Sequence, residues 1–158
     1  MPQVVETIDI ELPVRTVYNQ WTQFEEFPTF MEGVEEVRQL DDTHLHWVAQ
    51  VGGRRQEWDA EITEQKPDDR VAWKSVSPEH NQAGAVTFHR LSEDATRVTV
   101  QMEWEPSGMM ERAGAMVGMD DRRVRGDLER FKQMLESRGR ETGAWRGEVP
   151  RPDERDGL

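Results

Sequence analysis

Two arginines, Arg54 and Arg90, lie in segments where apolar residues alternate with polar ones, as in a strand. Each takes a position on the side of that strand that is mostly apolar. A guanidinium group that faces an apolar interior could hold the carboxylate or enolate of a small molecule and so stabilise an oxyanion. The alternative is that both side chains lie near strand ends, where they reach solvent or pair with an acid such as Glu103. Gln56 and Ser75 are the other polar residues at these positions, and each needs a hydrogen-bond partner if it is buried.

Two histidines, His44 and His46, share one strand face at a spacing of two, which is compatible with chelation of a metal ion. They fall on the charged face, and no third ligand accompanies them, so we expect surface histidines and no metal site. The absence of cysteine excludes thiol nucleophiles, thiolate zinc sites and iron–sulfur clusters. No inward histidine supplies an acid–base pair, so the sequence assigns no catalytic residue and predicts no cofactor.

Large rings and methionines provide most of the other candidate binding residues. Flat rings stack against apolar ligands, and methionine adapts to irregular shapes. Ordinary core packing is the alternative for each of them. The residues after the first helix could form a movable lid, or they could attach the second short helix firmly to the sheet. Beside the two arginines, the candidate ligand-binding residues are Phe27, Phe30, Trp47, Trp58, Trp73, Phe88, Met102, Trp104 and Met116.

The N-terminal third predicts one strand followed by two short helices. Apolar and polar residues alternate over 3–11, which is typical of a strand, and Pro13 ends it. Apolar residues over 14–21 recur at the spacing of one helix face, and proline is tolerated at the start of a helix. A second short helical piece is expected over 25–31.

The segment 34–105 predicts six further strands separated by turn residues. Gly52 and Gly53 suit a tight hairpin because glycine readily adopts the positive φ that such turns require. Short turns imply antiparallel neighbours, so every sequential pair of these strands should be adjacent. The expected result is one seven-stranded antiparallel sheet.

After Ser107 the apolar spacing predicts a single helix of about 30 residues that ends before Gly139. Residues 1–138 therefore form one expected domain. Residues 139–158 are rich in glycine, proline and charge, and we expect a charged C-terminal tail with little fixed structure. Whether that tail docks through Trp145 is left open.

The alternation also predicts that one face of the sheet is apolar throughout, with Leu45, Trp47 and Ala49 as examples. An α+β fold must cover such a face, and the C-terminal helix is the only long element available for this. A twisted sheet that curls around one helix leaves a wedge between them. We therefore expect an internal cavity.

This order of elements resembles the helix-grip fold of the START-related (SRPBCC) superfamily, which includes polyketide cyclase/dehydrase and coenzyme-Q-binding branches. The segments that carry the resemblance are Trp21–Met31, Glu57–Ile62, Val71–Ser75 and Asp127–Lys132. The resemblance implies a hydrophobic cavity for lipids, quinones, polyketides or other apolar compounds, with catalysis in some branches only.

The amino-acid composition makes some classes of binding partner unfavourable. The chain has 20 basic and 32 acidic residues and a formal charge of −12, so nucleic acid and anionic membranes are poor partners. No apolar run is long enough to span a membrane, and we expect a soluble cytoplasmic protein of open oligomeric state. The leading hypothesis is binding of an apolar small molecule, with or without cyclase/dehydrase-type chemistry. The alternatives are a non-enzymatic lipid or quinone carrier and a protein-interaction module.

Overall fold

The computed structural model describes residues 3–51, 53–76, 82–104 and 121–151. Within these ranges the chain starts with one strand, continues through two short helices and a run of six strands, and then forms one longer helix, in the order that the sequence predicts. In chain order the elements are β1 (Gln3–Ile10), α1 (Val14–Trp21), the 3₁₀ helix η1 (Phe24–Thr29), β2 (Val34–Gln39), β3 (His44–Val51), β4 (Arg54–Lys66), β5 (Arg70–Ser75), β6 (Gln82–Ser92), β7 (Ala95–Trp104) and α3 (Asp121–Arg138).

The strands form one antiparallel sheet in the order β1-β7-β6-β5-β4-β3-β2. The predicted meander of six strands is confirmed, and the N-terminal strand completes the sheet by pairing with the last one. Gly53 has a φ of 79° in the β3–β4 hairpin, which explains why this turn uses glycine. The predicted fold class is therefore confirmed.

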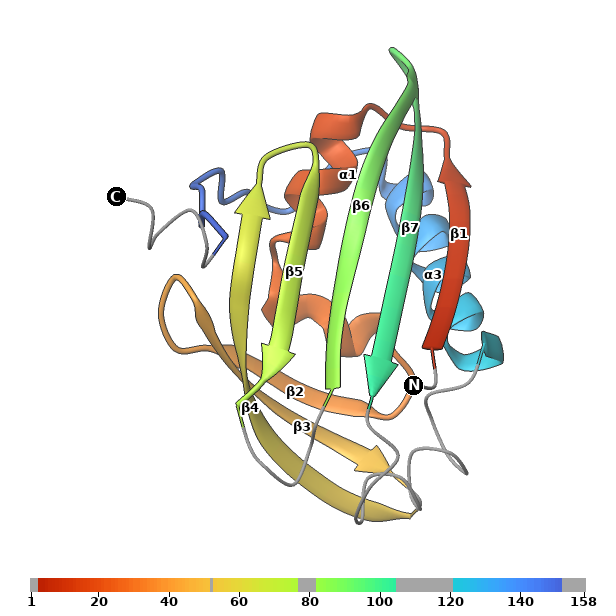
Figure 1. The fold of residues 1–158 in the computed structure, drawn as a ribbon. Coiled ribbons are helices and arrows are strands. Elements are labelled where there is room, and N and C mark those ends of the chain that lie inside the picture. The colour runs from red at the N-terminus through yellow and green to blue at the C-terminus, as the bar shows by residue number, and fades with distance from the viewer. Residues whose placement is uncertain (1–2, 52, 77–81, 105–120, 152–158) are drawn as a thin grey trace.

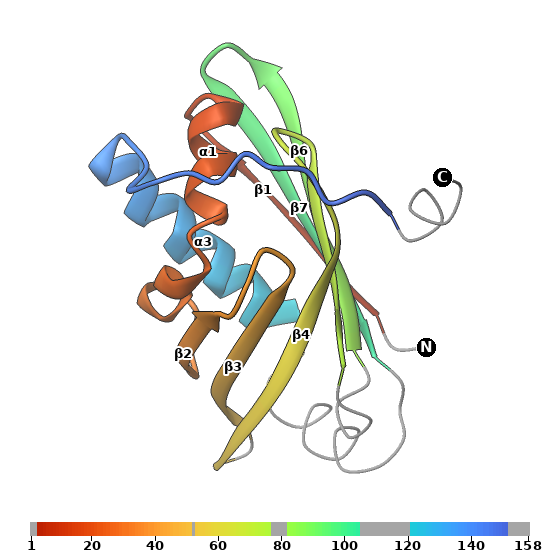
Figure 2. The same cartoon turned by 90° about the vertical axis from the view of Figure 1, so that its left-hand side faces the viewer.

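The concave face of the sheet is covered by the helices (Figures 1 and 2). α1 begins directly after Pro13, and Val17, Tyr18 and Trp21 on its inner face are buried. α3 lies over the same face, and its apolar stripe is buried through Leu128, Phe131 and Leu135. Its 18 residues correspond to about 27 Å of helix. The earlier part of the expected helix, 107–120, lies outside the described residues.

The segment after α3 differs from the expected loose tail. Gly139 ends the helix with a φ of 80°, and its N–H donates to the carbonyl of Leu135. Residues 140–151, which we call the C-terminal strap, then cross α1 towards β4 (Figure 2). Val149 is buried and exchanges two 2.9 Å backbone hydrogen bonds with Gln65. Packed structure therefore continues past the domain boundary expected at residue 138.

Polar contacts hold the strap against α1. The backbone N–H of Trp145 donates to Thr22 Oγ1 over 3.1 Å. The segment after α3 therefore docks at Trp145, which the sequence left open. Arg146 donates to Asn19 and to Asp68, each over 2.7 Å, and its guanidinium lies 5.6 Å from the centre of the Tyr18 ring. Side-chain hydrogen bonds of this kind have no periodic signal in the sequence, so docking of the strap could not be predicted.

Candidate ligand-binding cavity

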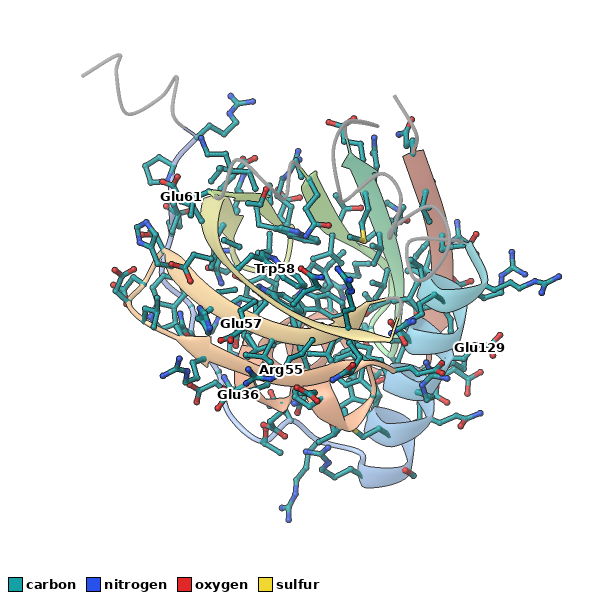
Figure 3. The ribbon with its side chains drawn as sticks, turned by 90° about the horizontal axis from the view of Figure 1, so that it is seen from below. Glu36, Arg55, Glu57, Trp58, Glu61 and Glu129 are labelled. Carbon is teal, nitrogen blue, oxygen red and sulfur yellow. The ribbon has the colours of Figure 1, made fainter. Side chains whose placement is uncertain are left out.

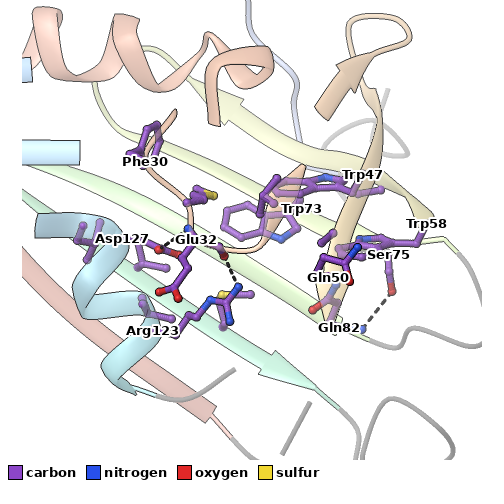
Figure 4. A pocket seen from close by; sticks show the side chains of 18 of the residues that line it. Phe30, Glu32, Trp47, Gln50, Trp58, Trp73, Ser75, Gln82, Arg123 and Asp127 are labelled. Atoms are coloured by element: carbon purple, nitrogen blue, oxygen red, sulfur yellow. Dashed lines mark hydrogen bonds between the residues drawn. The ribbon is translucent and has the colours of Figure 1, made fainter. Parts of the chain in front are cut away.

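A cavity of about 150 Å³ lies between the concave face of the sheet and the first described turns of α3 (Figure 4). Strands β3 to β7 form its wall, and the chain that follows η1 closes one side. Most of the lining is apolar or aromatic, as expected for a small-molecule site. The lining residues are Trp21, Phe30, Met31, Glu32, Val34, Trp47, Ala49, Gln50, Trp58, Ala60, Trp73, Ser75, Gln82, Val100, Met102, Arg123, Val124, Asp127 and Leu128.

Two tryptophans on neighbouring strands form a flat part of the wall. Trp47 and Trp58 are direct partners in the β3–β4 register, so their side chains leave the sheet on the same face. Their ring centroids are 6.0 Å apart and the ring planes differ by 4°. Parallel rings present a broad apolar surface on which another flat ring can stack.

The position of the Trp73 ring requires a glycine at the paired residue of the neighbouring strand. Gly84 is the β6 partner of Trp73, and a Cβ atom at Gly84 would lie 2.5 Å from the Trp73 ring. Glycine is therefore required here because the indole occupies the space that any side chain would take.

Charged groups gather at the end of the cavity formed by α3 (Figure 4). The backbone N–H of Glu32 donates to Asp127 Oδ1 over 3.1 Å, and Arg123 donates to the carbonyl of Glu32. Arg130 reaches both Asp127 and the carbonyl of Phe30. Burial raises the pKa of the Asp127 carboxyl, while the Glu32 N–H and Arg130 oppose that rise. These contacts attach the chain after η1 to α3.

Uncharged polar groups gather at the β5–β6 side of the cavity (Figure 4). Gln82 is 8% exposed, and its backbone N–H donates to Ser75 Oγ over 3.1 Å. The side-chain oxygen Oε1 of Gln82 is buried and has no hydrogen-bond partner among the residues that the structure describes. Gln50 borders the cavity from β3; it is exposed, and its amide donates to Glu35 over 3.0 Å.

The structure divides the predicted binding residues into groups. Five of them, all apolar, line the cavity. Phe27 and Phe88 instead belong to the packed core, with exposed fractions of 3% and 5%. Trp104 pairs with Gln82 in the backbone register, but its side chain and all of Met116 lie outside the described residues. The predicted residues that line the cavity are Phe30, Trp47, Trp58, Trp73 and Met102.

Arg54 and Arg90 do not line the cavity, which corrects the prediction that they bind a ligand anion. Both side chains are exposed. Arg54 is the first residue of β4, and Arg90 pairs with Thr96 beside the β6–β7 turn, six residues along β6 from Gly84. Their positions in the strand alternation were assigned correctly, but neither side chain is buried, because each lies where the sheet extends beyond the helices that the structure describes. The alternative that placed them near strand ends describes them better.

Two cavity residues were missed although the sequence carried a signal for each. Gln82 has the same parity as Val86 and Phe88, but it was assigned to the turn that precedes β6. Asp127 lies three residues after Val124, on the apolar face of α3. A polar residue in an apolar repeat was the available signal in both cases.

The opposite face of the same strands is charged. Glu57 precedes Trp58 on β4 and points to the other side of the sheet (Figure 3). On β3, His46 Nδ1 lies 2.6 Å from Asp59 and Nε2 lies 3.0 Å from Glu57. These hydrogen bonds raise the pKa of His46, chiefly through Asp59. His44 contacts Asp41, so both histidines bond to carboxylates on this outer surface.

Within the ranges that the structure describes, no helix has both the length and the apolar content needed to cross a membrane.

Comparison with known proteins gives both a close sequence relative and a set of structures with the same fold. An uncharacterized 17.2 kDa protein of the melC2–rnhH intergenic region of Streptomyces lincolnensis is 55% identical over 149 residues, which is 94% of this chain and 99% of the relative. An aromatase/cyclase from a Streptomyces species superposes with a TM-score of 0.72 at 15% identity and covers 91% of this chain and 99% of its own. A START superfamily protein from Mycobacterium smegmatis superposes with a TM-score of 0.65 at 14% identity, over 86% and 95% of the two chains.

At these identities the solved structures show the fold alone, and they confirm the START-related helix-grip architecture. The family assignment comes from the sequence itself. Residues 10–133 match the family model described as polyketide cyclase / dehydrase and lipid transport. The match spans more than half of the chain, so this protein belongs to the polyketide cyclase/dehydrase and lipid transport family.

Proposed function

We propose that this protein binds an apolar small molecule of the lipid, quinone or polyketide-like class by enclosing a ring-sized part of it in the cavity. The chain has a hydrophobic ligand-binding fold, and its family description covers both cyclases and lipid transport. The observation that carries the proposal is the cavity of about 150 Å³ bordered by Trp47, Trp58 and Trp73. An apolar space of about this size holds one benzene-sized ring.

The charged groups of the cavity support binding without turnover. Asp127 is bonded to the Glu32 N–H and to Arg130, and Arg123 is bonded to the Glu32 carbonyl. A general acid or base must reach a proton of the substrate, and these groups are already engaged in holding the chain after η1. Stacking and burial of a ring are therefore the interactions that the described lining can supply.

Toluene is a suitable probe of the cavity because it is a single apolar ring. We expect toluene to shift the indole N–H resonances of Trp47, Trp58 and Trp73 in an NMR titration and to leave that of Trp145, on the strap, in place. The substitution Ala60→Leu adds a branched side chain inside the cavity, so toluene affinity should fall by about tenfold or more.

The matched control is Ala85→Leu, which adds the same side chain on the outer face of β6. Toluene affinity should be unchanged in this variant. Uniform shifts of all indole signals, or equal loss of binding in the two variants, would contradict an internal site. Native mass spectrometry of the protein purified from its own host then identifies the natural ligand.

A further inference from the structure

One short stretch of the cavity lining belongs to neither a helix nor a strand. Among the lining residues that the structure describes, Phe30, Met31 and Glu32 alone lie outside those elements. The other described parts of the lining have the backbone hydrogen bonds of a helix or of the sheet. Residues 31–33, which we call the η1–β2 link, therefore form the part of the described lining that regular structure does not hold in place.

The two ends of the η1–β2 link are fixed. Before the link, Phe30 is 3% exposed, and its ring centroid lies 5.0 Å from that of Phe131. After the link, Val34 pairs with Ala49 in the sheet, and the N–H of Gln50 donates to the carbonyl of Gly33 over 2.7 Å. Any displacement of the link is therefore limited to a few residues between two anchored points.

Side chains of α3 hold the η1–β2 link against the helix. The N–H of Glu32 donates to Asp127 Oδ1 over 3.1 Å, and Arg123 donates to the carbonyl of Glu32 (Figure 4). Arg130 donates to the carbonyl of Phe30 over 2.9 Å and also bonds to Asp127. A Cβ atom at Gly33 would collide with the Arg123 guanidinium, so glycine serves both this close approach and the φ of 84°.

These contacts are open to water. The Arg130 side chain is 43% exposed, and that of Glu32, which lies 3.8 Å from it, is 70% exposed. Water can replace hydrogen bonds and ion pairs of this kind, so they break at a lower free energy than the packed core does. The η1–β2 link can therefore open locally while the rest of the chain stays folded.

We infer that the η1–β2 link is a lid through which the ligand enters and leaves, and that Asp127, Arg123 and Arg130 form the latch that keeps it closed. This inference rests on the proposed function, because it requires a ligand in the cavity. It adds how the exchange of that ligand is controlled. Opening exposes apolar lining to water, so the closed state dominates, and release of the latch limits the rate of exchange.

Arg130→Met tests the latch without changing a described lining residue. Arg130 contacts the link and Asp127, but it is not among the described residues that line the cavity. Methionine keeps most of the apolar length and removes the charge and the hydrogen bonds. The rates of toluene association and dissociation should both rise by about threefold to tenfold, while the Kd stays within about twofold. NMR line-shape analysis of the Trp47 indole signal at several toluene concentrations measures both rates.

The matched control is Arg125→Met, the same substitution on the same helix. Arg125 pairs with Glu6 on β1, away from the link, so both toluene rates should match those of the unmodified protein. Amide hydrogen exchange adds a measurement that needs no ligand. The Glu32 amide should exchange faster in Arg130→Met and at the original rate in Arg125→Met.

The outcomes separate the lid from the proposed function. If toluene binds all three proteins with equal rates, or if both variants speed its exchange equally, the lid is overturned and the proposed function stands. A weaker affinity of Arg130→Met with an unchanged association rate also overturns the lid. If toluene does not bind the unmodified protein, the proposed function fails and the lid fails with it.

The unmodified protein provides a second test if Arg130→Met does not fold. Toluene that fills the closed cavity should slow hydrogen exchange of the Glu32 amide, because the lid must open for either process. Exchange of this amide that is equally fast with and without saturating toluene overturns the lid.

Discussion

Aromatic side chains serve opposite purposes at the two ends of the space between sheet and helices. At the packed end, defined by Tyr18, Phe88 and Phe131, rings meet edge to face, with 5.3 Å between Tyr18 and Phe88. At the cavity end, Trp47 and Trp58 lie parallel and border a void. The residue types are alike, and the difference lies in what covers them.

Three elements cover the packed end. α1 lies on the sheet, α3 lies beside it, and the strap crosses over α1 (Figure 2). Trp21 marks the boundary, since it packs 5.2 Å from Phe131 and also lines the cavity. An aromatic residue on the inner face is therefore core or cavity wall according to the number of elements that close over it.

The largest effect should come from Phe131→Ala at the packed end. Phe131 is fully buried and contacts both Trp21 and Phe30, so its loss should lower the free energy of unfolding by about 3–5 kcal/mol. Chemical denaturation measures this. Trp58→Ala, which removes a larger but half-buried ring from the cavity wall, should cost less. A larger cost for Trp58→Ala would remove the distinction between the two ends.

Substitutions that enlarge a side chain should destabilise the packed end and leave the stability of the cavity end nearly unchanged. Val98 is fully buried beside Phe88, so Val98→Ile should destabilise the protein by about 1–3 kcal/mol through overpacking. Ala60→Val projects into the cavity, so it should leave the free energy of unfolding within about 0.5 kcal/mol or raise it. Thermal unfolding of the two variants tests the comparison, which fails if they are equally destabilised.

Removal of a strap contact should weaken the packed end without changing the cavity. Arg146 donates to Asn19 and Asp68 and is 26% exposed, so Arg146→Ala should cost about 1–2 kcal/mol of unfolding free energy. The control is Arg97→Ala, whose pair with Asp9 is about half exposed and is screened by solvent, so its loss should cost less than the loss of Arg146. Toluene affinity should be unchanged in both variants. Loss of toluene binding in Arg146→Ala would show that the two ends are coupled.

The smallest effect concerns the outer face behind the cavity wall. The hydrogen bonds that the imidazole of His46 donates to Asp59 and Glu57 raise the pKa of His46 in the folded state. The stabilisation is therefore complete below about pH 6.5, the ordinary histidine value, and is lost as pH rises through the raised folded pKa. Both carboxylates are about half exposed, so the change should be about a few tenths of a kcal/mol.

His46→Gln isolates this contribution. The difference in unfolding free energy between the unmodified protein and His46→Gln should shrink as pH rises from acid to alkaline. Urea denaturation at several pH values follows it, and a difference that grows with pH contradicts the assignment.

The amino-acid sequence determined the order of the elements, the meander of the sheet and which residues face inward. Side-chain direction repeats every two residues in a strand and about every 3.6 in a helix, so these properties follow from spacing alone. The bounds of α1, the stop at Gly139 and the inward positions of Trp47, Trp58 and Trp73 are examples.

Tertiary structure decided which inward residues border a void and which are packed. Phe88 and Trp73 follow the same alternation, yet α1 covers one while the other lies over Gly84. The register shift in β4 between Ile62 and Glu64 precedes the buried Gln65, and the two-residue alternation of the sequence does not indicate it. Alternation sets only the direction of a side chain, whereas its surroundings depend on elements distant in the chain, and these decide between core and cavity.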